Sequence, residues 1–269
     1  MVEFLSYGFV QRGLLAGSLV AAACALLGVF LVLKRLSLIG DGMSHVCLTG
    51  VAVALLTSTS PVYMSIPVVA VASLGIMKLA KKFKIYGDAA IGIISAAGLS
   101  VGLLLTALAG GFNTDLLGYL FGSILTVTRG ETILCALLLL IVAGGIFLFY
   151  RLLVATCFDE SFACTRGVPV RIVDTGLVLV TSVAVVLSFK VVGIFLISAL
   201  IIIPPVTALL ISRTFKQVLW LAAGFGVLSV WIGIYISFIF NIPSGAAIIL
   251  INLFFLFAGY LLSKGVPRG

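Results

Sequence analysis

Apolar runs dominate the sequence, and most of them approach the length of about 20 residues that an α-helix needs to cross a membrane. Of the 269 residues, 63% belong to the hydrophobic set and only 9% are charged. In a water-soluble domain about a half of the residues are hydrophobic and about a quarter are charged, so the composition excludes a soluble globular protein. We expect an all-α, polytopic transmembrane helical bundle with eight or nine full crossings. The predicted spans are 12–33, 43–58, 62–80, 90–110, 132–153, 172–189, 192–212, 217–240 and 243–263.

Two of these nine runs are unusual, which is why the number of crossings stays open. The run 43–58 is short and carries His45, and the run 192–212 contains Pro204 and Pro205. Proline has no N–H and its ring crowds the preceding turn, so we expect the helical ladder to break there, either as a gate or as a static kink. The interrupted segment 111–131 favours a re-entrant or interfacial element. No linker divides the chain, so residues 1–269 are predicted to form a single transmembrane domain.

The net charge of +8 is explained by the position of the basic residues. They lie in short groups between the apolar runs, as in cytoplasmic loops under the positive-inside rule. If the group at Lys34 is cytoplasmic, alternation leaves Arg12, Arg129 and Lys190 outside and the other thirteen of the sixteen basic residues inside. This asymmetry predicts an external N-terminus and an internal C-terminus. The basic residues do not form a stripe interleaved with exposed aromatic residues, as they do in proteins that bind nucleic acid.

Asp41 and His45 are the most informative polar pair in an apolar context. Residues four apart project from one face of a helix, and a carboxylate beside an imidazole offers two ligands to Zn²⁺ or Mn²⁺. His45 is the single histidine of the chain. A structural role is equally compatible with this spacing: Asp41 would then cap the helix, and His45 would hydrogen-bond to a neighbouring helix.

Two ligands do not complete a metal site. A symmetric homodimer would supply a second aspartate and a second histidine on its axis, since an isologous interface brings the same residues together twice. The pair therefore suggests a site shared by two copies of the chain.

Four segments of the chain resemble, in the same order, the membrane permease of the zinc and manganese family of ABC importers. They are Gly13–Gly50 with its core GVFLVLKRLSLIGDGMSH, LGYLFGSIL (117–125), FDESFACTRGVPV (158–170) and VVGIFLISALIIIPPVTALL (191–210). The resemblance implies a homodimeric permease in the bacterial cytoplasmic (inner) membrane. It also implies that Asp41 and His45 line the translocation path and bind Zn²⁺ or Mn²⁺ as transported substrate, with no permanently bound cofactor. After the histidine, Cys47 and Thr49 stand where the family more often has an apolar residue and proline.

The loop 154–171 is similar to the coupling element of ABC importers, a short cytoplasmic helix that docks on the ATPase. The residues that carry this similarity are Phe158, Asp159, Glu160, Ala163 and Gly167. An acidic start favours a helix N-terminus, and a glycine followed by a proline suits its end. An ordinary amphipathic loop helix would have the same local pattern.

The chain has no G-x-x-x-x-G-K-[ST] motif, which P-loop proteins use to hold ATP phosphates. A cytoplasmic ATP-binding-cassette subunit is therefore an expected partner, together with an extracytoplasmic metal-binding protein. Glu131, Asp115 and Arg129 would either meet that protein or be solvated at the membrane surface. Two alternatives remain: an ABC permease for an iron chelate or a corrinoid, and an intramembrane enzyme with Asp41 and Asp174 as an acid/base pair.

Overall fold

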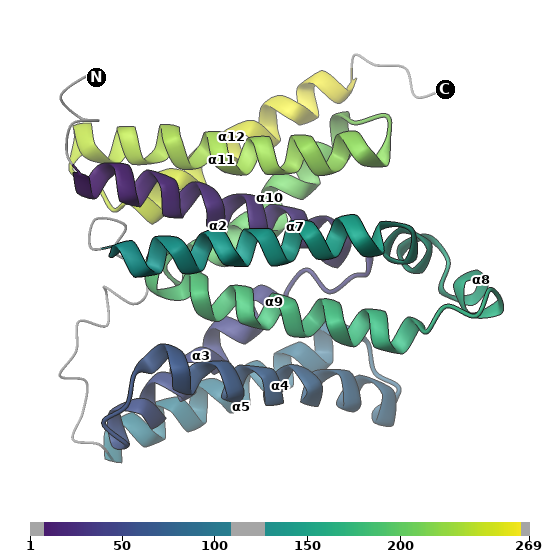
Figure 1. Ribbon diagram of the computed structural model, residues 1–269, viewed down its shortest axis with the longest axis horizontal. Helices are drawn as coiled ribbons and strands as arrows, with labels where there is room; N and C mark the ends of the chain where they lie inside the picture. Colours follow the sequence, from purple (N-terminus) through teal and green to yellow (C-terminus); the bar gives the residue numbers. More distant parts are fainter. Residues whose placement is uncertain (1–7, 109–126, 265–269) are drawn as a thin grey trace.

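The computed structural model describes residues 8–108 and 127–264, and all the regular structure in these two ranges is helical. The helices shown in Figure 1 are α2 (Gly8–Leu33), α3 (Ile39–Leu56), α4 (Pro61–Phe83), α5 (Gly87–Leu108), α7 (Arg129–Phe158), α8 (Glu160–Thr165), α9 (Val170–Val192), α10 (Ile194–Ile211), α11 (Phe215–Phe240) and α12 (Ser244–Lys264).

Eight of these helices are long and apolar enough to cross a membrane. Each of the nine predicted spans corresponds to a helix. The one that is not among the eight is α10, whose apolar part, Leu196–Ile211, is shorter. The expectation of an all-α transmembrane bundle with eight or nine spans is thus confirmed. The second helix begins at Ile39 rather than at residue 43, so Asp41 lies inside it and not before it.

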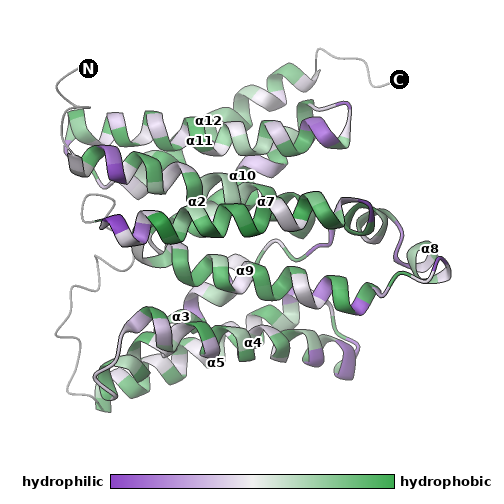
Figure 2. Cartoon of the chain, viewed as in Figure 1, coloured by the Kyte–Doolittle hydropathy of each residue, from purple (hydrophilic) through white to green (hydrophobic). Residues whose placement is uncertain are grey.

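The long helices run along a common direction, with α8 projecting beyond one end of the bundle (Figure 1). We call that end the α8 end. α2 packs against α7, α10 and α11, while α3 packs mainly against α4 and α5. α9 lies between these two groups and contacts helices of both. In Figure 2 hydrophilic residues gather at the ends of the helices and the stretches between them are hydrophobic, as expected of a bundle whose middle lies in lipid.

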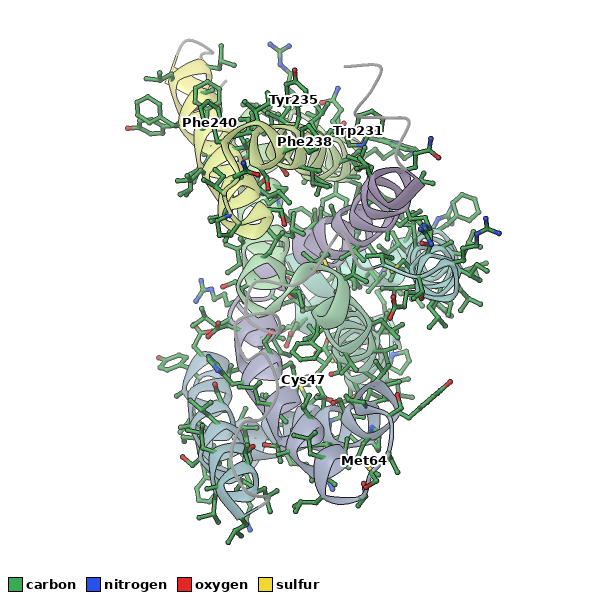
Figure 3. All side chains as sticks on the ribbon, turned by 90° about the vertical axis from the view of Figure 1, so that its left-hand side faces the viewer. Cys47, Met64, Trp231, Tyr235, Phe238 and Phe240 are labelled. Carbon is green, nitrogen blue, oxygen red and sulfur yellow. The ribbon has the colours of Figure 1, made fainter. Side chains whose placement is uncertain are left out.

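α2 is the central helix of the bundle. Its residues from Ala16 to Leu31 include nine that are wholly buried, among them Val20, Cys24 and Phe30. On its outer side, Trp231 of α11 donates its indole N–H to Ser18 Oγ at 2.9 Å. Figure 3 shows Trp231 with Tyr235 and Phe238 on α11, at the opposite side of the bundle from Met64, with Cys47 between them.

Close contact between α3 and α5 depends on glycine. A Cβ on Gly98 would lie 2.6 Å from Val46 Cγ2, and a Cβ on Gly102 would lie 3.0 Å from the Thr49 backbone nitrogen. The absence of a side chain lets α5 approach the turn of α3 that follows His45. Thr49 continues the regular helix and donates its hydroxyl to the Gly98 carbonyl at 2.5 Å. The threonine therefore ties α3 to α5.

The chain breaks between α9 and α10 at Gly193, where φ is +85°, and not at the two prolines. α10 continues through Pro204 and Pro205 to Ile211, so the expected end of the helical ladder does not occur there. Each proline still leaves the carbonyl four residues earlier without its helical donor. One of these carbonyls, that of Ile201, faces Gly28 of α2 so closely that a Cβ on the glycine would overlap its oxygen.

Candidate metal site and coupling helix

The first turn of α3 is positioned by the way in which α2 ends. Leu36 donates its N–H to the Leu31 carbonyl, and Arg35 donates to the Val32 carbonyl with a φ of +57°. This pair of bonds is a Schellman motif, which reverses the chain at a helix C-terminus. The linker 34–38 then leads back toward the interior of the bundle (Figure 1). As a result, α3 starts next to buried neighbours rather than in solvent.

Asp41 and His45 lie together on the first two turns of α3. Asp41 Oδ2 is 3.6 Å from His45 Nε2, as their spacing predicts. Asp41 does not cap the helix: the N-cap is Leu38, which has no side-chain capping bond, and Asp41 lies within the first turn. The capping alternative is therefore wrong, because the carboxylate turns toward other side chains.

A second side chain that contacts Asp41 comes from α10. Ser198 lies 157 residues further along the chain, and its hydroxyl donates to Asp41 Oδ1 at 3.4 Å. Gly40 makes room for this contact, because a Cβ there would lie 2.7 Å from Ile201 Cδ1. Ser198 was not among the predicted site residues, and an isolated serine in an apolar run carries no signal that would have identified it.

The donor atoms of the pair lie at a separation that a divalent cation can bridge. Metal bonds to nitrogen and oxygen of about 2.0–2.2 Å at a tetrahedral angle place the two donors about 3.4 Å apart, close to the 3.6 Å observed. The Asp41 side chain is 47% exposed and that of His45 is 30% exposed, so both remain accessible. His45 Nδ1 is buried and has no hydrogen-bond partner, an unsatisfied polar atom of a kind that is uncommon in folded proteins.

Within residues 8–108 and 127–264, no group of three or more histidine, cysteine, aspartate or glutamate side chains is placed to hold a metal. Asp41 and His45 are thus a pair and not part of a larger group of such side chains in these ranges. Asp174, which the enzyme alternative pairs with Asp41, is instead bound to Lys34: the ammonium donates to its Oδ1 at 2.5 Å. The structure thus offers no support for an acid/base pair of these two aspartates.

The predicted coupling residues form a compact turn of helix at the α8 end. Asp159 is the N-cap of α8 and accepts the N–H of Phe162 at 2.9 Å. Ala163 is buried and packs the short helix inward. Gly167 has a φ of +76°, the left-handed conformation that glycine adopts without strain. These local features explain why the sequence forms a helix and a stop here.

Two exposed aromatic residues lie at the start of the coupling loop. Phe158, the last residue of α7, is 70% exposed and has a ring contact with Phe215 at the start of α11, where the ring centroids are 6.0 Å apart. Phe162 is more than half exposed, and the Arg166 guanidinium lies 5.1 Å from its ring centroid. Phe162 was missed by the sequence analysis, although an apolar residue in a charged loop is a usable signal.

The remaining predicted outer residues are only partly visible. Asp115 and most of the predicted re-entrant segment 111–131 lie outside the described residues. Glu131 belongs to the first turn of α7, where its side chain accepts the Thr128 N–H at 2.9 Å. The Thr128 hydroxyl in turn accepts the Glu131 N–H at 3.3 Å. This capping box gives Glu131 a structural role in starting α7.

Comparison with known proteins gives a consistent result over nearly the whole chain. Residues 6–263 match the profile of the ABC 3 transport family. The manganese transport system membrane protein MntC of Halalkalibacterium halodurans is 35% identical over 249 residues, which are 93% of this chain and 85% of that protein. The high-affinity zinc uptake system membrane protein ZnuB of Buchnera aphidicola is 29% identical over 247 residues, 91% and 95% of the two chains.

Among solved structures, PsaBC from Streptococcus pneumoniae in complex with Fab is similar in fold and in sequence. The TM-score is 0.86 at 29% identity, and the alignment covers 96% of this chain and 95% of the matched chain. The arrangement of the helices described above is thus shared with that solved structure.

Proposed function

Since the chain belongs to the ABC 3 transport family, we propose that it is the permease subunit of an ATP-driven importer that carries Mn²⁺ or Zn²⁺ into a bacterial cell. The manganese and zinc systems named above include relatives that align with more than nine tenths of the chain. A carboxylate and an imidazole accept either ion, because selectivity between them depends on geometry and metal supply.

The observation that carries the proposal is the separation of 3.6 Å between Asp41 Oδ2 and His45 Nε2. A cation of this class bridges two donors at that distance with little movement of either side chain. Transport requires that the ion also leave, so a site with few ligands from each chain suits passage better than a closed structural site. Asp41 and His45 are transient ligands of the cargo in this account.

A second copy of the chain would complete the site. Asp41 keeps nearly half of its side-chain surface exposed, which leaves room for ligands from a partner. Two-fold symmetry would bring a second Asp41 and a second His45 to the same axis. The resulting two carboxylates and two imidazoles would neutralise the charge of a divalent cation within the apolar bundle.

The α8 end is the cytoplasmic end in this proposal, and the ATP-binding-cassette subunit docks there. α8 projects beyond the helix ends (Figure 1), and Phe158, Asp159, Glu160, Ala163 and Gly167 shape it. An extracytoplasmic binding protein delivers the metal at the other end. Basic residues at the α8 end, including Lys81 and Lys82 in the last turn of α4, support its assignment to the cytoplasm under the positive-inside rule.

α10 is the moving element that we assign to the gate. It combines the two prolines with Ser198, whose hydroxyl contacts Asp41. Carbonyls that lack a helical donor lower the cost of bending at Pro204 and Pro205. Bending there would shift Ser198 relative to the Asp41 carboxylate and so change how strongly Asp41 binds the ion.

Uptake of radioactive manganese into cells tests this function. The cells lack their own manganese and zinc importers and express the chain with its partner ATPase and binding protein. We expect uptake that is abolished by omitting the ATPase and is reduced by competing Zn²⁺ or Mn²⁺. Competition by an iron chelate or a corrinoid, with none by either free ion, would contradict the proposal and favour the alternative cargo.

A further inference from the structure

A buried lysine joins α2 to the coupling segment. Lys34 is the first residue after α2, and its side chain is only 4% exposed. Its ammonium lies 2.5 Å from Asp174 Oδ1, 3.2 Å from the Thr156 carbonyl oxygen and 3.7 Å from Glu160 Oε1. These partners belong to α9, to the end of α7 and to the first position of α8. One cation therefore contacts α8 and the two long helices, α7 and α9, that α8 connects.

The two carboxylates hold the ammonium in different ways. Asp174 is close and 15% exposed, while Glu160 is more distant and 64% exposed. A buried cation requires a paired anion, and Asp174 is that anion. Glu160 lies on a short helix whose other residues, except for Ala163, are exposed. Displacement of α8 therefore changes the distance from Lys34 to Glu160, while the contact with Asp174 on α9 remains.

Lys34 is also tied to the metal site through the backbone. The Schellman bonds from Arg35 and Leu36 to the last turn of α2 hold the residues on either side of it. The linker 34–38 continues directly into α3, where Asp41 stands in the first turn. A force on the Lys34 side chain thus acts on the short segment that sets the position of the carboxylate.

We propose that Lys34 is a positioning residue that transmits the movement of α8 to Asp41 during the transport cycle. The inference rests on the proposed function and adds a path that the sequence analysis did not contain. A buried ion pair is a poor source of stability compared with apolar side chains of the same size. The pair therefore suits a role other than stability, and its contacts with three helices allow Lys34 to follow a displacement of α8.

The test uses the full chain with its ATPase subunit in proteoliposomes that contain the binding protein outside. The double variant Lys34→Met/Asp174→Leu replaces the pair with apolar side chains and leaves no buried charge. We expect it to assemble and hydrolyse ATP, while the amount of metal transported per ATP falls about ten-fold. Lys81→Met is the matched control, since it removes the same charge from an exposed position at the same end.

A transport-to-ATP ratio equal to that of the control would overturn the inference. If the double variant does not assemble, Glu160→Gln decides the matter, because Glu160 is exposed and the Asp174 pair remains. Its ratio is expected to fall as well while the ATPase subunit still co-purifies with the chain in the same amount, and an unchanged ratio would refute the path through Lys34. Failure of the wild-type chain to transport either metal would overturn the proposed function. Transport by the wild type with an unchanged ratio in the variant would overturn this inference alone.

Discussion

Replacing Gly28 with alanine is expected to destabilise the bundle, because this glycine is where α2 meets α10. A Cβ at this position would overlap the Ile201 carbonyl oxygen. It would also lie 2.8 Å from the Ile201 carbonyl carbon and 2.8 Å from Pro205 Cγ. The obstacle is mainly backbone, so no side-chain rotation can relieve it.

The magnitude follows from the distance by which the helices must separate. Carbon atoms in contact prefer about 3.5–4.0 Å, so α2 and α10 must move apart by about 1 Å. Overpacking of this kind costs about 1–3 kcal/mol, and the rigid backbone places Gly28→Ala at the upper end. Alanine favours a helix over glycine by about 0.5–1 kcal/mol, which leaves a net loss of about 2 kcal/mol. On the scale of about 2–4 °C per kcal/mol for domains of this size, Tm falls by about 4–8 °C.

Thermal unfolding of the purified chain in detergent measures the effect. Gly144→Ala is the matched control, because a Cβ on this α7 glycine meets nothing within 4 Å. The control is expected to keep or raise Tm through its better helix propensity. A Gly28→Ala variant that is as stable as Gly144→Ala would refute the close approach of α2 to the Ile201 carbonyl.

Three further substitutions separate the parts of the account. Ser198→Ala removes the hydroxyl that contacts Asp41 and is expected to weaken apparent metal affinity in uptake assays about ten-fold, whereas Ser212→Ala at the C-cap of the same helix leaves it unchanged. Phe162→Ala is expected to weaken co-purification of the ATPase subunit about thirty-fold, as for a central interface residue, without lowering Tm; equal recovery of the ATPase would exclude Phe162 from that interface. Lys84→Gly relieves a φ of +50° at an exposed helix end and is expected to raise stability by up to about 1 kcal/mol, and a fall in Tm would show that the backbone is not strained there.

The span pattern and the proximity of Asp41 to His45 were both predictable from the sequence for physical reasons. Lipid leaves a helix no polar partner outside itself, so each span must appear as a long apolar run. Asp41 and His45 are one turn apart, and local spacing alone places them on one face. The same holds for the coupling helix, whose N-cap Asp159 and terminal Gly167 are local signals.

Contacts between distant segments could not be read from the sequence in the same way. Ser198 meets Asp41 only because Gly40 allows α10 to approach, and 157 residues separate the two side chains. Lys34 had the appearance of one more basic loop residue, and its burial depends on how α7, α8 and α9 close around it. The two prolines were expected to interrupt their helix, but α10 continues through them, and one of the carbonyls that they leave free faces Gly28 of α2.

Metal transport by the single variants Asp41→Asn and His45→Ala tests the central claim most directly. Each variant is purified with the ATPase subunit and assayed in proteoliposomes against wild type, with thermal unfolding measured to confirm that the bundle is intact. Loss of one of a pair of metal ligands is expected to reduce uptake of Mn²⁺ or Zn²⁺ by at least about ten-fold, while ATP hydrolysis in the absence of metal is retained. Undiminished uptake by both variants would show that the ion does not pass between Asp41 and His45.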